Sequence, residues 1–338
     1  MVARIVPEIG SQDSRQLCDL YDAATHLTKL DLATERGISL DTLKHYRSAC
    51  RAAFVKRDYK LPPDSSWEEH IDIFKRMDKL VAFHQKTPTE ITIVIDTKLP
   101  IGVVITADWQ LGQFGVDYDS FSRDCNIWET EPGLHIMVGG DGYQNIIEES
   151  KIGSAHSQMP ISPQKGLYVL TLKKLQQKIL CIGTGNHNYW SALKTGEDWD
   201  NEIARKLKLV YTKHFAVINL KVGSMLYSIL RIHKAKFESS FNLTHAAKQN
   251  QRIHFPDARI VVIEHKHTGA MEQYRYNERE CIAARPGTYA VYDDFAMREG
   301  FFGAHVCNPT VVLYPNEDRL VGFKDMDDAL IYLRAARS

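Results

Sequence analysis

The stretch IGVVITADWQ, residues 101–110, joins a run of apolar, mostly β-branched residues to the polar side chains of Asp108 and Gln110. Such a run predicts a buried strand, because β-branched side chains pack well on a pleated surface. A carboxylate directly after a buried strand lies in the crevice at the strand's carboxyl end, where open α/β sheets bind their ligands. The stretch therefore predicts an α/β fold and the sheet edge that carries its functional site.

Polar residues follow an apolar run at four more places along the chain. Carboxylate, amide and imidazole groups are the ligands that hard and borderline divalent cations take, and a pair of cations needs about seven of them, one shared. If the strand pleat persists, His265 and His267 point to one face and can reach neighbouring cations. The four further motifs are Gly140-Asp141, Gly185-Asn186-His187-Asn188, Arg231-Ile232-His233 and Glu264-His265-Lys266-His267.

After residue 88 the chain alternates strand-like and helix-like segments, which predicts a layered α/β or α+β domain with a largely buried sheet over residues 89–338. The polar segment 236–250 either shapes a substrate crevice or is a surface loop that enters a helix at Thr244. The expected strands cover residues 91–95, 101–106, 134–138, 179–182, 215–220, 227–232, 260–263 and 289–292, and the expected helices cover residues 142–149, 166–177, 198–208 and 325–336.

Residues 1–88 differ from the rest of the chain, because apolar residues recur there in steps of three and four and no convincing strand appears. We expect a small all-α domain with a boundary near residue 88. Within it, residues 32–57 have the spacing of a helix-turn-helix: a small residue at Ala33, a glycine at Gly37 and an N-cap at Ser39. The resemblance is to the helix-turn-helix of transcription regulators and covers about 25 residues.

The same segment is basic although the protein as a whole carries no net charge. Residues 36–60 hold seven basic side chains and two acidic ones, a local charge of +5. Such a stripe suits neutralisation of DNA phosphates beside a major groove. The alternative is a helical hairpin that packs on the catalytic domain with its charges solvated. The residues expected to contact DNA are Ser39, Thr42, Lys44, Arg47 and Arg51.

The composition, 44% hydrophobic and 25% charged, is that of a soluble globular protein. Six cysteines lie scattered without a CxxC pair, which favours reduced thiols in a cytoplasm. The sequence has no signal-peptide pattern and no apolar run of about 18 residues, so we expect a cytoplasmic protein without a membrane partner. The oligomeric state stays open, with a homodimer as one option.

Taken in order, the five motifs resemble those of the calcineurin-like metallophosphoesterase superfamily. That pattern is Asp-x-His, Gly-Asp, Gly-Asn-His-Asp/Glu, His and Gly-His-x-His, each after a strand, and the resemblance covers roughly residues 100–270. It implies a β-sandwich flanked by helices. The two-part layout is similar to phosphoesterases of phages and mobile elements, and this resemblance implies a bacterial or phage-infected cell.

The resemblance also implies a role for each position. His187 would be the acid that protonates the leaving oxygen, and Arg231 and Lys266 would contact the phosphate. The cofactors would be two divalent metal ions, Mn²⁺ first, with Mg²⁺, Fe or Zn²⁺ as alternatives. The first metal would take Asp108, Gln110 and His267, Asp141 would bridge both metals, and the second would take Asn186, His233 and His265.

Three positions depart from the family pattern. Gln110 stands in place of a histidine, and a neutral oxygen is a poorer ligand than imidazole for a transition metal. Glu264 replaces the glycine before His265. Asn188 replaces an acidic residue after His187, so a different group must orient that histidine.

The expected function is hydrolysis of phosphodiester bonds by a hydroxide activated between two metals, without a covalent intermediate. The basic N-terminal segment favours a DNA nuclease, because it would concentrate the enzyme on its polymer. One alternative is a phosphodiesterase or phosphatase that acts on nucleotides or other small molecules. Another is a DNA-binding scaffold with a degenerate metal site.

Overall fold

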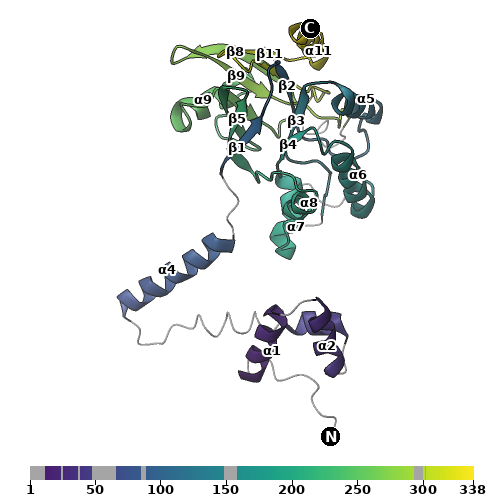
Figure 1. The fold of residues 1–338 in the computed structure, drawn as a ribbon, viewed down its shortest axis with the longest axis vertical. Helices are drawn as coiled ribbons and strands as arrows, with labels where there is room; N and C mark the ends of the chain where they lie inside the picture. Colours follow the sequence, from purple (N-terminus) through teal and green to yellow (C-terminus); the bar gives the residue numbers. More distant parts are fainter. Residues whose placement is uncertain are drawn as a thin grey trace. The chain divides into compact units, whose positions relative to one another are not determined.

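The computed structural model describes residues 12–23, 26–36, 39–47, 66–84, 89–147, 158–292, 300 and 302–338. The chain divides into two compact units, residues 1–86 and residues 87–338 (Figure 1). Each unit is described below by itself.

The described part of the first unit is helical. It contains α1 (Gln12–Ala23), α2 (His26–Glu35), a helical segment at residues 40–47 and α4 (Trp67–His84). The Ser39 hydroxyl accepts a hydrogen bond from the Thr42 amide at 3.1 Å, as an N-cap does. Gly37, Arg51 and residues 48–57 of the expected second helix lie outside the described residues.

A small core joins the first helices of this unit. Ala33 is buried on α2, and its small side chain allows the neighbouring helices to approach closely. The other buried members come from α1 and from residues 40–47: Leu17, Cys18, Tyr21, Leu43 and Tyr46. The helices α1 and α2 and the helical segment at residues 40–47 therefore share a core.

The second unit is built on two β-sheets. The five-stranded sheet has the order β11-β10-β2-β3-β4, and the six-stranded sheet has the order β1-β5-β6-β7-β9-β8. The first contains β2 (Ile101–Thr106), β3 (Leu134–Val138), β4 (Ile179–Ile182), β10 (Thr310–Leu313) and β11 (Leu320–Phe323). The second contains β1 (Glu90–Ile95), β5 (Phe215–Val222), β6 (Met225–Ile232), β7 (Ile260–Ile263), β8 (Ala270–Tyr276) and β9 (Arg279–Arg285).

The two sheets pack face to face over an apolar core. Ile101, Val103 and Ile105 of β2 meet the inner residues of the six-stranded sheet, such as Ile218 and Ile229. All six residues of β2 are buried, because helices cover the other face of its sheet. These helices are α5 (Tyr118–Thr130), α6 (Ile161–Lys174), α8 (Trp199–Lys206) and α11 (Met326–Arg337), whereas α9 (His245–His254) packs on the outer face of the six-stranded sheet. The expected sandwich with flanking helices is confirmed.

The strand directions decide where the polar motifs meet. β2, β3 and β4 run parallel, so the residues that follow them, Asp108, Asp141 and Asn186, reach the same edge of the five-stranded sheet. β6 and β7 also run parallel, which brings His233 and His265 to one edge of the six-stranded sheet. Because the sheets face each other, both sets of motifs converge on one crevice.

Two expected elements are absent from the described residues. Residues 289–292 form no strand there, and Ala290 makes only an isolated bridge with Val116. Residues 142–147 are not helical, because Asn145 has a left-handed φ of 44° and its side chain bonds outside the segment. Conversely, β8, β9, β10 and β11 were not expected from the pattern of apolar residues.

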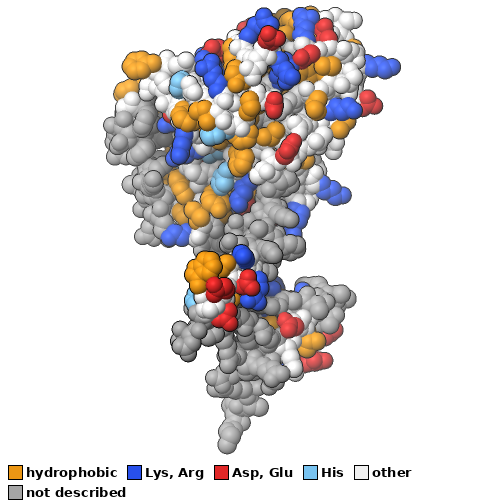
Figure 2. Space-filling model, turned by 90° about the vertical axis from the view of Figure 1, so that its left-hand side faces the viewer, with side chains coloured by type: hydrophobic (Ala, Val, Ile, Leu, Met, Phe, Trp, Pro, Cys, Tyr) orange, Lys and Arg blue, Asp and Glu red, His pale blue; other side chains and the backbone are white. Residues whose placement is uncertain are grey.

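The surface mixes charges of both signs, as the zero net charge requires. Figure 2 shows basic and acidic side chains interspersed over the visible face of the molecule. Within the described residues, no helix is both long and apolar enough to cross a membrane.

Candidate metal centre

The loops after β2 and β3 hold two buried carboxylates in an unusual backbone conformation. Asp108 and Asp141 have φ values of 51° and 56°, and Gln110 has 51°. The two loops are hydrogen-bonded to each other, with the Asp108 amide 2.8 Å from the Gly140 carbonyl and the Gln110 amide 3.0 Å from the Asp141 carbonyl. A non-glycine residue in the left-handed region costs of order 1–3 kcal/mol and tends to occur at functional sites.

The histidines after β7 share this conformation. His265 has a φ of 79° and His267 a φ of 59°. The strand pleat therefore does not persist past Ile263, and the expectation that it orients the two histidines is wrong. Their imidazoles reach the carboxylates because the backbone takes a left-handed conformation at both histidines.

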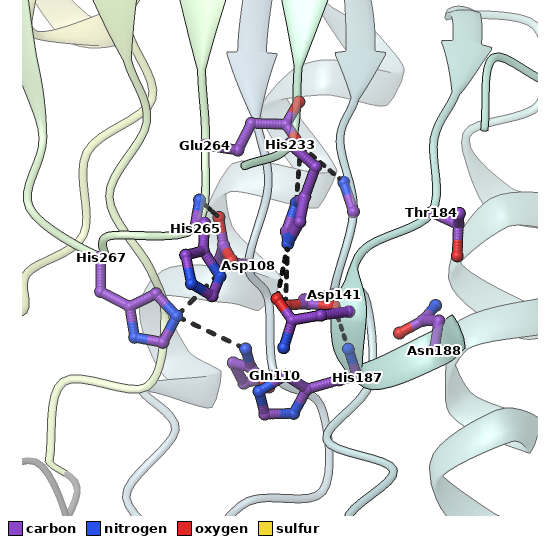
Figure 3. A network of polar contacts seen from close by, with 12 residues as sticks. Asp108, Gln110, Asp141, Thr184, His187, Asn188, His233, Glu264, His265 and His267 are labelled. Carbon is purple, nitrogen blue, oxygen red and sulfur yellow. Dashed lines mark hydrogen bonds and ion pairs between the residues drawn. The ribbon is translucent and has the colours of Figure 1, made fainter. Parts of the chain in front are cut away.

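Four side chains converge in this crevice (Figure 3). One ligand atom from each of Asp108, Asp141, His233 and His265 lies within 4.8 Å of those from the other three. Asp108, Asp141 and His233 are at most 2% exposed. Buried carboxylates and imidazoles at such separations have the chemistry and spacing of a cation site.

The spacing around His233 fits a bound cation. Two ligand atoms on one ion, each about 2.0–2.2 Å from it, lie roughly 3.0–3.4 Å apart. The Nε2 atom of His233 lies 3.1 Å from Oδ2 of Asp141 and 3.1 Å from Oδ1 of Asn186. The separations among these atoms of Asp141, Asn186 and His233 are thus those of atoms that share one cation.

A second group of donors lies on the other side of Asp108. Nε2 of His267 is 3.5 Å from Oδ1 of Asp108 and 3.5 Å from Nε2 of Gln110. Among the described residues, Oδ1 of Asp108 and Oε1 of Gln110 are buried and accept no hydrogen bond. A buried oxygen without a donor is costly, and a cation would satisfy both of these atoms.

His187 lies at the start of α7 (Asn186–Thr195) and is 8% exposed. Its backbone amide donates to Oδ1 of Asp141 at 2.9 Å, and its Nδ1 donates to the Gln144 carbonyl at 2.7 Å. Trp190 packs on the ring at a centroid distance of 4.4 Å. The carbonyl of Gln144 therefore orients this imidazole in place of the missing acidic neighbour and leaves Nε2 for chemistry.

Asn188 belongs to a different buried network. Its Nδ2 donates to both carboxylate oxygens of Asp200, at 3.0 and 2.8 Å, and the Thr184 hydroxyl donates to Asp200 at 2.6 Å. Burial raises the pKa of Asp200 to about 7, although these hydrogen bonds oppose the shift. An acidic side chain is thus present beneath α7, contributed by α8 and not by the residue after His187.

Arg231 lies behind the ligands, where it cannot contact a phosphate. It is 0% exposed, and its guanidinium donates to the Lys213 carbonyl at 2.9 Å and contacts both carboxylate oxygens of Glu264 at 2.7 and 2.9 Å. The expectation that Arg231 binds substrate is therefore wrong. Lys266 is exposed and keeps that role as an expectation.

The sequence interpretation gave Glu264 no role, yet it is a central buried acid of the site. Its Oε2 atom accepts hydrogen bonds from the Gly140 amide at 2.9 Å and from Nδ1 of His233 at 3.0 Å, in addition to Arg231. One signal was available: Glu264 and Arg231 both interrupt apolar strand ends, where a charged residue requires a partner.

The electrostatics of the centre favour ionised carboxylates. Burial works to raise the pKa of Asp141, but His233 and His187 hold it well below its usual value. Burial likewise opposes a charge on His233, but Asp141 and Glu264 overcome it and raise the pKa of His233 to about 10. Burial, together with the neighbouring His233, lowers the pKa of His265 to about 4. A proton on His233 thus balances the carboxylates, and a bound cation would displace it.

Glycines allow the loops to approach each other. A Cβ atom on Gly185 would lie 2.0 Å from Oδ1 of Asp141, and one on Gly140 would lie 2.6 Å from Nδ1 of His233. Both glycines precede a ligand. Their role in this structure is close approach, because neither has a positive φ.

A comparison with protein-family models finds no match, and a comparison with curated proteins finds none. Several solved structures are similar to this chain. A metallophosphoesterase from Sphaerobacter thermophilus is 13% identical with a TM-score of 0.35, and the match covers 70% of this chain and 100% of that one. The calcineurin-like phosphoesterase YfkN from Bacillus subtilis is 9% identical with a TM-score of 0.36, with coverage of 70% and 100%. Vps29 from Entamoeba histolytica, complexed with zinc, is 12% identical with a TM-score of 0.34, with coverage of 65% and 89%. Similarities this distant carry no argument about activity, so we base the function on the site's own atoms.

Proposed function

We propose that residues 87–338 form a metal-dependent phosphoesterase of the calcineurin-like type. The observation that carries the proposal is the convergence of Asp108, Asp141, His233 and His265 within 4.8 Å in a buried crevice. The unsatisfied oxygens of Asp108 and Gln110 support it, because a cation would complete them.

The donors divide into two groups around Asp141. One group consists of Asn186, His233 and His265, and the other of Asp108, Gln110 and His267. When bound, two divalent cations supply Lewis acidity toward a phosphoryl oxygen and lower the pKa of water to near neutrality. Manganese is our first choice, because the donor set mixes carboxylate, amide and imidazole groups.

The protein's own groups would complete the reaction. His187 is held by the Gln144 carbonyl through Nδ1, so its Nε2 is the atom that would deliver a proton to the leaving oxygen. Burial lowers the pKa of His187 below its usual value, and the charge of Asp141 opposes part of this shift and so helps the imidazole to hold that proton. The exposed Lys266 lies between two ligands and would contact a nonbridging oxygen of the substrate.

DNA is the proposed substrate, and the first unit is the proposed DNA-binding element. Lys44 is exposed and forms an ion pair with Asp41 at 3.2 Å, which a phosphate could replace. Arg47 lies three residues further along the same helical segment, so both basic side chains share a face. Ser39 and Thr42 contribute the cap, with their hydroxyls 2.8 Å apart.

The test is hydrolysis by the full chain with Mn²⁺ and four kinds of substrate: single-stranded DNA, duplex DNA, cyclic nucleotides and bis-p-nitrophenyl phosphate. Asp141→Asn removes the shared carboxylate. Asp124→Asn is the matched control, because Asp124 of α5 is also buried but its carboxylate hydrogen-bonds to Tyr289 and Asn308. We expect loss of metal-dependent hydrolysis in the first variant only.

The pattern of substrates separates the alternatives. Cleavage of the small diester but not of DNA would refute the nuclease and leave a small-molecule phosphodiesterase or phosphatase. DNA binding without metal-dependent hydrolysis of any substrate would refute the enzyme and favour a scaffold.

A further inference from the structure

Glu264 touches several parts of the proposed metal centre without facing the crevice. It is 1% exposed and lies on the far side of His233 from Asp141. Its Oε2 atom accepts from the Gly140 amide, from Arg231 and from His233, at 2.9, 2.9 and 3.0 Å. One carboxylate oxygen thus links a loop, a strand and a histidine.

The contact with His233 decides which ring nitrogen carries hydrogen. Arg231 and the Gly140 amide are donors, so Glu264 is ionised and can only accept, and Nδ1 of His233 must be the donor. The neutral ring therefore has its lone pair on Nε2. That lone pair faces Oδ2 of Asp141 and Oδ1 of Asn186, each 3.1 Å away. Three acceptor atoms then face one point. Their mutual repulsion can be relieved only by a cation or a proton at that point.

The contact with Gly140 positions a second ligand. The Gly140 amide precedes Asp141 directly, so the hydrogen bond to Glu264 fixes the start of the turn that carries this carboxylate. The neighbouring Gly139 makes room for the contact, because a Cβ atom there would lie 2.4 Å from Oε1 of Glu264. The loop is therefore shaped to receive the glutamate.

Arg231 holds Glu264 in this place. Its Nε and Nη2 atoms contact the two carboxylate oxygens at 2.7 and 2.9 Å, and its other nitrogen donates to Thr212 and to the Lys213 carbonyl. Gly183 accommodates the guanidinium, because a Cβ atom there would lie 2.0 Å from it. A paired and buried carboxylate of this kind is rigid, which is what a group that orients a metal ligand needs.

We propose that Glu264 is a positioning residue that fixes His233 and Asp141 for the cation they share with Asn186, and so makes that site the tighter of the two. The inference rests on the proposed metal centre. The other group of donors differs from it in two ways: the His267 side chain is 26% exposed, and Gln110 is a neutral ligand. The proposal gives Glu264, the charged residue directly before His265, a role in metal binding.

The test is Mn²⁺ binding to the full chain by isothermal titration calorimetry, with thermal unfolding of the metal-free protein measured in parallel. We expect two classes of site in the wild type. Glu264→Gln should weaken the tighter class by about 10- to 100-fold, the range for loss of a group that orients a metal ligand. The Mn²⁺ affinity of the weaker class of site should change much less.

Two further variants separate positioning from general stability. Glu131→Gln breaks another ion pair, between the buried Glu131 and the exposed Arg334, at a distance from the centre. It should lower the unfolding temperature and leave Mn²⁺ affinity unchanged. Replacing both partners, Arg231→Met with Glu264→Leu, removes the buried charges together, which proteins often tolerate. This double variant should fold and still bind Mn²⁺ weakly.

The outcomes distinguish this inference from the proposal beneath it. Wild-type affinity in Glu264→Gln, or an equal loss in Glu131→Gln, would overturn the role of Glu264 while the metal centre stands. Wild-type affinity in the folded double variant would overturn it too. A wild-type protein that binds no Mn²⁺ would refute the metal centre itself.

Discussion

Gln110 is the residue on which the weaker metal position depends. Its amide is fully buried, with Nε2 3.5 Å from Nε2 of His267 and an oxygen that accepts no hydrogen bond from the described residues. An imidazole is a better ligand than an amide for a transition metal. Gln110→His should therefore tighten Mn²⁺ binding at the weaker class of site, by roughly tenfold, or about 1.4 kcal/mol.

The control for this change is Gln113→His, which alters a second buried glutamine in the same loop. Calorimetry with Mn²⁺ would measure both variants beside the wild type. If Gln110→His binds Mn²⁺ with unchanged affinity, Gln110 is not a ligand, and the first site consists of Asp108, His267 and the shared Asp141.

Asp200 provides a prediction about pH. Burial raises its pKa from 3.8 to about 7 in the folded protein, so the folded state keeps a proton that the unfolded chain has already lost between about pH 4 and pH 7. The free energy of unfolding should consequently fall as the pH rises through this window. Asp200→Asn should flatten that fall, because the amide cannot ionise.

Urea unfolding between pH 5 and pH 8, with a chelator present, measures the effect. A variant whose stability changes with pH in parallel with the wild type would show that Asp200 does not titrate in this range. The hydrogen bonds from Thr184 and Asn188 would then outweigh its burial.

At the scale of single residues, the sequence predicted which side chains lie close together but not the backbone conformation that brings them there. Asp108, Asp141, His233 and His265 were expected together, because each follows an apolar run. The left-handed backbone of three of them could not be predicted, since nothing in an aspartate or histidine requires it. The pairing of Arg231 with Glu264 was missed for a related reason: both were assessed against a family pattern, one as a phosphate ligand and the other as a departure.

Among the elements, the loop that joins β4 to α7 has little room for added volume. A Cβ atom on Gly185 would lie 2.0 Å from the Asp141 carboxylate. Gly185→Ala should therefore displace Asp141 or α7 and lower both Mn²⁺ affinity and hydrolysis, by about tenfold or more in affinity if Asp141 moves.

Gly166→Ala is the matched control for that prediction. Gly166 lies within α6, and a Cβ atom there would meet nothing within 4 Å. Alanine in a helix is favoured over glycine by roughly 0.5–1 kcal/mol, so this variant should be slightly more stable and equally active. Equal activity and equal Mn²⁺ affinity in both variants would contradict the prediction. The loop that carries Asp141 could then shift to accept the extra methyl group without weakening the metal site.

The elements that bury both faces were easier to predict than those at the edges. β2, β3, β4 and β7 are short continuous apolar runs, and their positions were confirmed. The β8–β9 hairpin was missed because β8, Ala270–Tyr276, mixes charged and aromatic residues and lies at the edge of its sheet. Residues 289–292 were expected to form a strand because Tyr289 and Ala290 are apolar. These two side chains pack in the core beneath α5, but the segment pairs with no neighbouring strand of the described residues.

At the scale of the whole molecule, the sequence predicted a change of architecture near residue 88, and the chain divides into two compact units, residues 1–86 and residues 87–338. The net charge is zero, so any affinity for DNA must come from local charge. The proposal assigns that charge to residues 36–60. It predicts that substitutions in this segment weaken DNA binding by the full chain without affecting hydrolysis of a small phosphodiester.

Lys44→Glu combined with Arg47→Glu should weaken DNA binding by the full chain while hydrolysis of bis-p-nitrophenyl phosphate stays unchanged. Each lost phosphate contact lowers the salt dependence of binding, so the slope of log affinity against log salt should fall by about two. Lys75→Glu with Arg76→Glu, an equal charge change on the exposed face of α4, is the control. Fluorescence anisotropy with a labelled duplex at several salt concentrations measures both. If the two double variants lose affinity equally, DNA responds only to the overall charge of the first unit, and residues 39–47 are not its binding surface.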